Sequence, residues 1–281
     1  MSVPPLLRLL FDDAAVFPPG NLPLAEAVPA HRAHRVARYA DAVGPFLCGA
    51  GRLAELAAAA GPADGPALRV GLVLPGGSAS LAEALAAAAP FEIAAVELVS
   101  ADLPKTVAVL DERLPAGTTA YVELPRDSRV EDALDVLAGT PYRAKFRTGG
   151  LTAEAFPGVY ELAGSLMACA ERAVPYKCTA GLHNAVRHTD PVTGFEHHGF
   201  LNVLLAALAA RAGDRTGTAD ALRERSGEVL AGAARALSDD QVTLIRESFT
   251  SFGTCSIAEP LADLADLGLP ATTLTPHLED R

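Results

Sequence analysis

The chain has 281 residues, half of them apolar and a fifth charged, which allows a large buried core and excludes global disorder. Its formal net charge of -11, with no basic run to offset it, argues against a nucleic-acid partner. No apolar run is long enough to span a bilayer, and the apolar start is too short for a signal peptide, so we expect no membrane partner. The widely spaced cysteines argue against a zinc ribbon or a disulfide scaffold and are expected to be reduced thiols of a cytoplasmic protein.

Eight short runs of β-prone residues alternate with segments of helical period. The predicted strands are Leu6–Phe11, Pro45–Cys48, Arg69–Leu74, Ile93–Val99, Thr119–Leu124, Arg143–Arg147, Pro175–Thr179 and a last one around Glu247–Thr254. The predicted helices are Leu24–Ala42, Arg52–Ala60, Ser80–Ala89, Leu103–Leu114, Val130–Ala138, Thr152–Ala173 and Ile257–Leu267. This alternation predicts a single (β/α)8 TIM-type barrel over residues 1–281. An open doubly wound sheet is the alternative, but no G-x-G-x-x-G motif follows the first strand.

The connection between the last two predicted strands is unusually long. About 65 residues separate them, where a crossover of about a dozen would suffice. We therefore predict an insertion over about residues 182–240, with helices at Phe200–Arg211 and Thr218–Leu237. A long loop after a barrel strand falls on the C-terminal face, so this insertion is expected to form a lid or a wall of the substrate site.

The C-terminal ends of all strands meet at one mouth of a β/α barrel, and barrel enzymes keep their sites there. Polar residues near these ends are therefore candidates although they lie far apart in the sequence. The carboxylates among them are Asp12, Asp13, Glu97 and Glu123. Asp12 and Asp13 precede a rigid Pro-Pro-Gly turn, so they either present carboxylates at the mouth or only close the edge of the barrel.

Lysine is rare in this chain, and two of its three lysines lie inside predicted strands. Lys145 and Lys177 stand on neighbouring strands, with Arg147 close to them. A lysine retained in an arginine-rich chain indicates a role that a guanidinium cannot fill, such as that of a Schiff-base nucleophile. Like-charge repulsion is expected to lower the pKa of both amines. The alternative is that both lysines are buried ion-pair partners of Glu97 and Glu123.

Three short motifs occupy the ends of the last three predicted strands. They read Lys145-Phe146-Arg147-Thr148-Gly149-Gly150, Lys177-Cys178-Thr179-Ala180-Gly181-Leu182 and Ser251-Phe252-Gly253-Thr254-Cys255-Ser256. Together they resemble the class I aldolases related to deoxyribose-phosphate aldolase. That family carries a K-x-x-T-G turn on strand six, a K-x-[ST]-x-G motif on strand seven and a Gly/Ser phosphate-binding turn after strand eight.

The resemblance implies a lyase that acts on a small anionic metabolite, with Lys145 as the Schiff-base nucleophile and Lys177 as the neighbour that lowers its pKa. The family's proton-relay acid is an aspartate on an earlier strand, and the candidates for it here are Glu97 and Glu123. The resemblance also implies that the anionic group of the substrate contacts Gly149, Gly181, Gly253 and Ser256 near a helix N-terminus. Further candidate substrate contacts at the mouth are Arg147, Gly150, Thr179, Thr254, Asp12 and Asp13.

The histidines of the predicted insertion leave a second hypothesis open. His183, two residues after Gly181, is the candidate acid/base. The aldolase hypothesis needs no cofactor, but the alternative is a metal-dependent barrel enzyme with a divalent metal held by histidines and carboxylates. Its candidate ligands are His183, His188, His197 and His198, with Glu97, Glu123 or Asp12. A non-catalytic barrel that binds an anionic metabolite is the third hypothesis, and a homo-oligomer is expected on general grounds.

Overall fold

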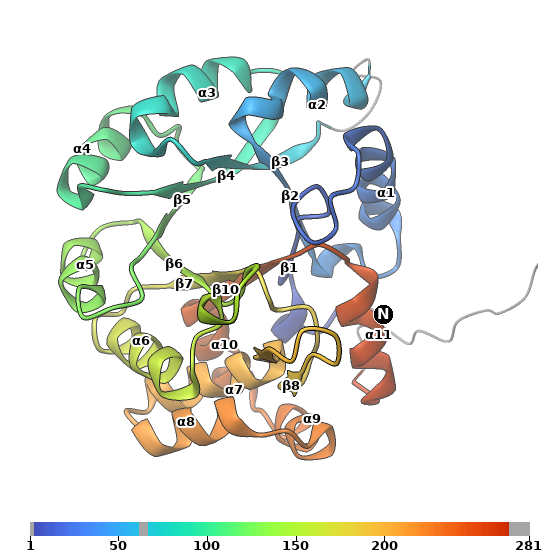
Figure 1. Ribbon diagram of the computed structural model, residues 1–281, viewed down its shortest axis with the longest axis vertical. Coiled ribbons are helices and arrows are strands. Elements are labelled where there is room, and N and C mark those ends of the chain that lie inside the picture. The colour runs from blue at the N-terminus through green and yellow to red at the C-terminus, as the bar shows by residue number, and fades with distance from the viewer. Residues whose placement is uncertain (1–2, 62–66, 270–281) are drawn as a thin grey trace, which may run out of the picture.

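Eight parallel strands close into a barrel in the computed structural model, which describes residues 3–61 and 67–269 (Figure 1). The order of the strands around the barrel is β1-β10-β7-β6-β5-β4-β3-β2. They are β1 (Phe11–Asp13), β2 (Val43–Gly49), β3 (Arg69–Leu74), β4 (Glu92–Val99), β5 (Thr119–Glu123), β6 (Arg143–Arg147), β7 (Tyr176–Thr179) and β10 (Phe249–Thr254). The predicted closed β/α barrel is thereby confirmed.

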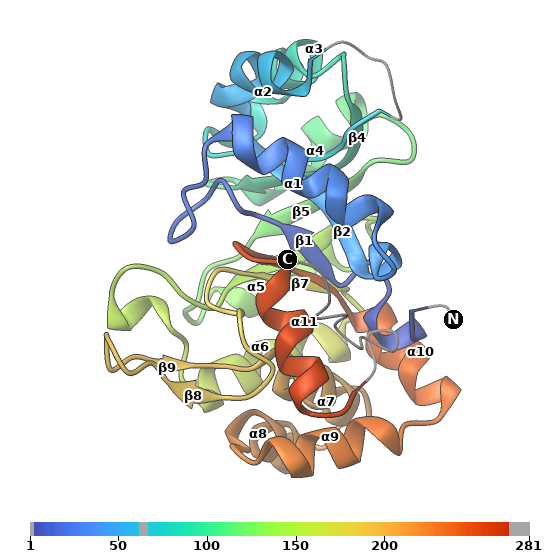
Figure 2. The same ribbon diagram turned by 90° about the vertical axis from the view of Figure 1, so that its right-hand side faces the viewer.

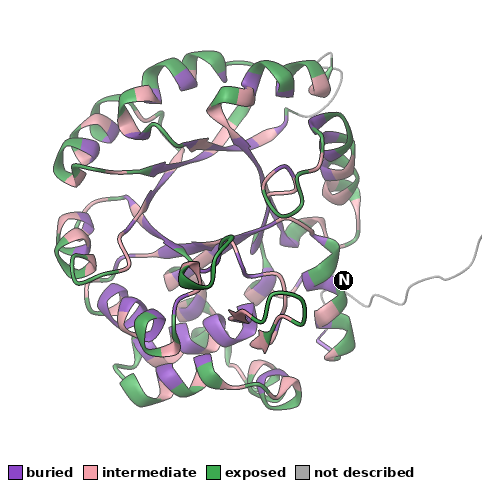
Figure 3. Ribbon diagram, in the orientation of Figure 1, coloured by how far each residue is buried: buried purple, intermediate pink, exposed green. Residues whose placement is uncertain are grey.

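Helices surround the barrel and bury its outer surface. They are α1 (Leu24–Val36), α2 (Leu53–Ala60), α3 (Leu81–Ala87), α4 (Leu103–Arg113), α5 (Val130–Leu137), α6 (Val159–Glu171), α7 (Phe200–Arg211), α8 (Arg215–Arg223), α9 (Gly227–Arg235), α10 (Asp239–Ser248) and α11 (Ala258–Asp266). Buried residues follow the strands and the helix faces turned toward them, and exposed residues lie on the outer faces (Figure 3). Phe11, Phe200 and Phe252 meet in this layer, with ring centroids 5.3–5.8 Å apart.

The segment between β7 and β10 differs from the predicted lid. Helix α7 packs against α6, α10 and β10, and most of its residues are buried, so α7 belongs to the wall of the barrel. Helices α8 and α9 pack on the outside of α7 rather than over the mouth (Figure 2). The two-stranded ribbon of β8 (His188–Thr189) and β9 (Glu196–His197) lies at the C-terminal end of the barrel, where His197 contacts Phe156 with ring centroids 4.4 Å apart.

Several predicted bounds differ from those of the structure, two of them next to a proline. The first strand was expected over Leu6–Phe11, but Pro5–Leu7 forms a 3-10 turn and Leu9 has a φ of 50°, so β1 begins only at Phe11. The helix expected over Thr152–Ala173 begins at Val159, after Pro157 and Gly158. The helix expected over Leu24–Ala42 ends at Val36, and a 3-10 turn covers Ala40–Ala42.

Two further differences follow from serine caps. The helix expected over Thr218–Leu237 is divided into α8 and α9, because the Ser226 hydroxyl accepts a hydrogen bond from the Val229 amide and starts a new helix. Ser238 and Gln241 form a capping box that begins α10, which the sequence pattern did not predict. In the described part of the chain, no helix combines the length and apolar character needed to cross a bilayer.

Candidate active site

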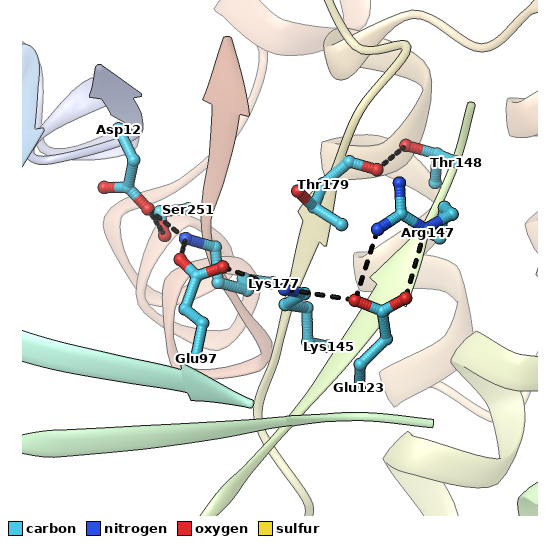
Figure 4. Close-up of polar contacts among 9 residues, drawn as sticks. All are labelled: Asp12, Glu97, Glu123, Lys145, Arg147, Thr148, Lys177, Thr179 and Ser251. Carbon is cyan, nitrogen blue, oxygen red and sulfur yellow. Dashed lines mark hydrogen bonds and ion pairs between the residues drawn. The ribbon is translucent and has the colours of Figure 1, made fainter. Parts of the chain in front are cut away.

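Lys145 and Lys177 point into the barrel side by side. They are opposite each other in the register of β6 and β7, as expected for neighbouring strands, and Glu123 is opposite Lys145 on β5 (Figure 4). Both lysines lie one inward-facing position below the strand ends, which are occupied by Arg147 and Thr179. The site is therefore deeper in the barrel than the sequence pattern predicted.

Glu97 links the two lysines. One of its carboxylate oxygens, Oε2, accepts a hydrogen bond from Lys145 Nζ at 3.0 Å, and the other, Oε1, pairs with Lys177 Nζ (Figure 4). Lys177 Nζ also donates to Asp12 Oδ2 at 2.5 Å, and Ser251 Oγ donates to the same oxygen at 2.7 Å. All four charged groups are buried, so each charge depends on its neighbours for stabilisation.

Glu123 and Arg147 extend this cluster toward solvent. Glu123 Oε2 lies 3.1 Å from Lys145 Nζ, and its Oε1 accepts from Arg147 Nε at 3.1 Å. The exposed fraction of the side chain rises along the series, from 1% for Lys177 through 5% for Lys145 and 17% for Glu123 to 46% for Arg147. Lys145 is thus the more exposed of the two lysines and the one that contacts Glu123. We call the six residues Asp12, Glu97, Glu123, Lys145, Arg147 and Lys177 the charge cluster.

The pKa values within the charge cluster correct one expectation. Burial alone lowers the pKa of the Lys177 ammonium, but the charges of Asp12 and Glu97 outweigh it, so the pKa is raised rather than lowered. Burial raises the pKa of Glu97, but the charges of Lys177 and Lys145 dominate and lower it to about 2. Burial raises the pKa of Asp12 despite its pairing with Lys177. Lys177 is therefore held as a charged ammonium.

Tyr121 is a neighbour of the charge cluster that the sequence reading missed. Lys177 Nζ lies 5.2 Å from the centre of its ring, and the Tyr121 hydroxyl contacts Thr250 Oγ1 at 3.0 Å. Strand alternation was the available signal, because Tyr121 precedes Glu123 by two residues on β5 and therefore faces the same interior.

Asp13 and Thr254 do not line the barrel, contrary to expectation. They are opposite each other in the register of β1 and β10, and both point outward because Asp12 and Gly253 take the inward positions. Asp13 Oδ2 lies 2.9 Å from His31 Nδ1, a buried contact with α1. Thr254 Oγ1 donates to the Ser256 carbonyl at 2.9 Å and so stabilises the turn after β10.

Two of the predicted anion-binding glycines, Gly149 and Gly181, lie where two loops pack closely together. A Cβ on Gly149 would lie 2.7 Å from Gly181 Cα, and a Cβ on Gly181 would lie 2.7 Å from the Thr148 carbonyl oxygen. The loops after β6 and β7 thus pack backbone to backbone, which by itself requires glycine at both positions. Gly150 is exposed, and the Ser256 hydroxyl accepts from the Glu259 amide at 3.2 Å at the start of α11.

We expect alanine at Gly181 to destabilise the fold more than alanine at Gly139. Both glycines have a positive φ, 76° and 78°, but nothing lies within 4 Å of a Cβ built on Gly139. Gly139→Ala should cost about 1 kcal/mol from the left-handed backbone alone, and the clash should add about 1–3 kcal/mol in Gly181→Ala. Urea denaturation measures both free energies of unfolding, and equal losses would contradict the close packing of the two loops.

The four histidines proposed as metal ligands do not gather into one cluster in the described part of the chain. His183 Nδ1 lies 3.2 Å from Glu259 Oε2 and 3.5 Å from Cys255 Sγ, on the side of α11. His188 and His197 face each other across the β8–β9 ribbon, with ring centroids 5.1 Å apart.

His198 uses both ring nitrogens in contacts within the protein. Nδ1 lies 3.2 Å from an Arg187 guanidinium nitrogen, and Nε2 lies 2.9 Å from the Pro157 carbonyl oxygen. Burial, with the Arg187 charge beside it, lowers the pKa of His198 to about 4, so the ring is neutral at pH 7. Within residues 3–61 and 67–269, no three His, Cys, Asp or Glu side chains gather as a metal site would require. The geometry therefore gives the metal hypothesis no support.

At this mouth, the charge cluster is the group of side chains best suited to catalysis. It holds a buried amine, that of Lys145, between two carboxylates, with a guanidinium at the solvent edge. A comparison of the chain with protein-family models, curated proteins and solved structures gives no match.

Proposed function

We propose that this protein is a lyase of the class I aldolase type, in which Lys145 forms a Schiff base with a small carbonyl substrate that carries an anionic group. The observation that carries the proposal is the position of Lys145 Nζ, 3.0 Å from Glu97 and 3.1 Å from Glu123, at the more accessible end of a buried charge cluster.

The charges around Lys145 suit a cationic intermediate. When an ammonium and a carbonyl condense, the products are an iminium ion and water, so the single positive charge on nitrogen is kept. Glu97 and Glu123, which pair with the ammonium, would therefore also stabilise the iminium. Preorganised charges in a site shielded from water act more strongly than they do in solution.

Glu123 is the proton carrier in this proposal. Attack requires Lys145 to lose a proton, and Glu123 Oε2 is close enough to accept it. The same proton then goes to the carbinolamine hydroxyl, which leaves as water. Burial raises the pKa of Glu123, but the charges of Lys145 and Arg147 outweigh it and lower the pKa. Glu97, which pairs with both lysines and has its pKa lowered to about 2, is less suited to this task.

Lys177 and Arg147 have supporting roles. Lys177 stays protonated and holds Glu97 in place, so it is a positioning residue rather than the nucleophile. Arg147 uses only part of its guanidinium on Glu123 and is 46% exposed, so it has N–H donors left for the anionic group of a substrate.

The β8–β9 ribbon is the part of the predicted insertion that we propose as a wall of the substrate site. His197 lies near His183 and the Gly181 backbone, and both groups influence its pKa, which burial lowers. Gly181 lies in the loop after β7, two residues after the last residue of that strand, Thr179. The ribbon therefore borders this loop.

Borohydride trapping tests the proposal directly, because the chain has only three lysines. The protein would be incubated with a panel of small keto and aldehyde acids and phosphorylated carbonyl compounds, reduced, and measured by intact mass and peptide mapping. We expect one adduct, located on Lys145, that is absent from Lys145→Arg. Lys105→Arg is the matched control, because Lys105 is exposed on α4 and should keep the adduct.

The proposal would be abandoned if the wild type formed no adduct with any compound of the panel. An adduct of equal yield in Lys145→Arg would refute it as well, since the modified amine would then be another group. Circular dichroism of Lys145→Arg is needed beside the trapping, because arginine must fit between the same two carboxylates.

A further inference from the structure

A cavity of about 730 Å³ opens at the end of the barrel opposite to the proposed active site. Arg69, Thr119 and Arg143 line it and are the first residues of β3, β5 and β6, and Arg246 lines it from the last turn of α10. The N-terminal ends of the strands therefore surround this cavity. Its volume falls within the range of small-molecule sites, about 300–1,000 Å³.

The lining of the cavity is strongly basic in a chain of net charge -11. Its arginines are Arg8, Arg69, Arg143, Arg211 and Arg246. The carboxylates of the lining are Asp12, which already pairs with Lys177, and Glu247. Arg69 pairs with Glu92 at 2.8 Å, whereas the other four have no carboxylate within 4.0 Å among the residues that the structure describes. The positive charge here is thus largely uncompensated.

Two of these guanidinium groups are fixed in place before any ligand arrives. Arg246 donates to the carbonyls of Phe249 at 2.9 Å and Arg8 at 3.0 Å. Burial lowers its pKa to about 10, so it keeps its charge at neutral pH. Arg143 donates to the Tyr121 hydroxyl at 3.1 Å and lies 5.7 Å from the centre of that ring. Preorganised donors lose little conformational entropy when they bind an anion.

We propose that this cavity is a second ligand site, which binds a small organic anion with two or three negative charges, such as a phosphate or diphosphate ester or a polycarboxylate. Five arginines against two carboxylates match that charge, and guanidinium groups bind phosphate and carboxylate oxygens in pairs. The apolar part of such a ligand would lie against Leu9, Ala95, Val174 and the Tyr121 ring.

This site is distinct from the proposed active site. The cavity reaches Asp12, whose carboxylate pairs with Lys177, so its occupant would lie behind the charge cluster rather than at the mouth. Lys145 and Arg147 do not belong to the lining of the cavity in the described part of the chain. The inference does not depend on Schiff-base chemistry.

Isothermal titration with the full chain tests the inference, with inorganic pyrophosphate, adenosine monophosphate and citrate as probes at constant ionic strength. We expect saturable binding of one equivalent of at least one probe. Arg143→Gln should raise the dissociation constant about tenfold or more, because it removes one charge-assisted contact of the guanidinium with the anion. Arg113→Gln is the matched control, because it removes the same charge from an exposed arginine of α4 and should leave the affinity unchanged.

Arg8→Gln provides a second variant if Arg143→Gln does not fold, because Arg8 is exposed on the cavity rim. The inference would be overturned by no saturable binding of any probe, by binding that neither cavity variant weakens, or by equal weakening in Arg113→Gln. Borohydride trapping on Lys145 involves none of these arginines, so failure of one proposal is distinguishable from failure of the other.

Discussion

Glu97→Gln should cost the protein about 3–5 kcal/mol of unfolding free energy, because it removes one partner from a buried ion-pair network. Glu97 is 1% exposed and pairs with both Lys145 and Lys177, so the amide would leave each ammonium with one carboxylate. Chemical denaturation measures the loss. Glu55→Gln is the matched control, since Glu55 pairs with Arg52 on the surface and should unfold like the wild type.

The pH dependence of stability gives a second measurement on the same variant. The pKa of Glu97 is lowered from 4.5 in an unfolded chain to about 2, so its contribution is complete above about pH 4.5. That contribution is lost as the pH falls toward 2, and Glu97→Gln should show a shallower loss of stability in this window. If Glu97→Gln unfolded like Glu55→Gln, the lysines would not be held as buried ammonium groups.

Glu123→Gln should slow Schiff-base formation on Lys145 by about 10²–10⁴-fold, the usual contribution of a positioned acid or base. The amide cannot take the proton from Lys145 Nζ, 3.1 Å away, or return it to the departing hydroxyl. Quenching with borohydride at a series of times measures the rate of adduct formation. This expectation depends on the proposed lyase function.

Glu55→Gln again supplies the control, because it also removes an arginine-paired glutamate but lies on α2, outside the charge cluster. The stability of Glu123→Gln should fall less than that of Glu97→Gln, since Glu123 is 17% exposed and bonds one lysine rather than two. A rate equal to that of the wild type would assign the proton transfer to another group and remove Glu123 from the mechanism.

The barrel could be predicted from the sequence because parallel strands and crossover helices leave a periodic apolar pattern. The position of Lys145 and Lys177 on neighbouring strands followed from the same count of strands, and the register of β6 and β7 confirms it. The bounds of elements were less predictable. Pro5 in the turn before β1 and Ser226 before α9 act locally on the backbone, and a periodic pattern averages over such single residues.

The assignment of residues to the mouth was less successful, for a geometric reason. Asp12 and Asp13 are adjacent in the sequence, yet Asp12 joins the charge cluster and Asp13 pairs with His31 on α1. Side chains of a strand alternate between the two faces. An error of one residue in the placement of β1 therefore exchanges which of these two aspartates faces the barrel interior. The four predicted histidine ligands were grouped by position in one segment, but the fold separates His183 from His198.

The sequence by itself determined that eight β/α units close into a barrel and that two scarce lysines stand on neighbouring strands, because both depend on local periodicity and order along the chain. The tertiary structure alone decided how the charges are paired. Glu97 on β4 lies between Lys145 on β6 and Lys177 on β7, and Arg143 and Arg246 line one cavity at the opposite end of the barrel. Such contacts join residues far apart in the sequence, and barrel closure and strand register bring them together, so no local pattern records them.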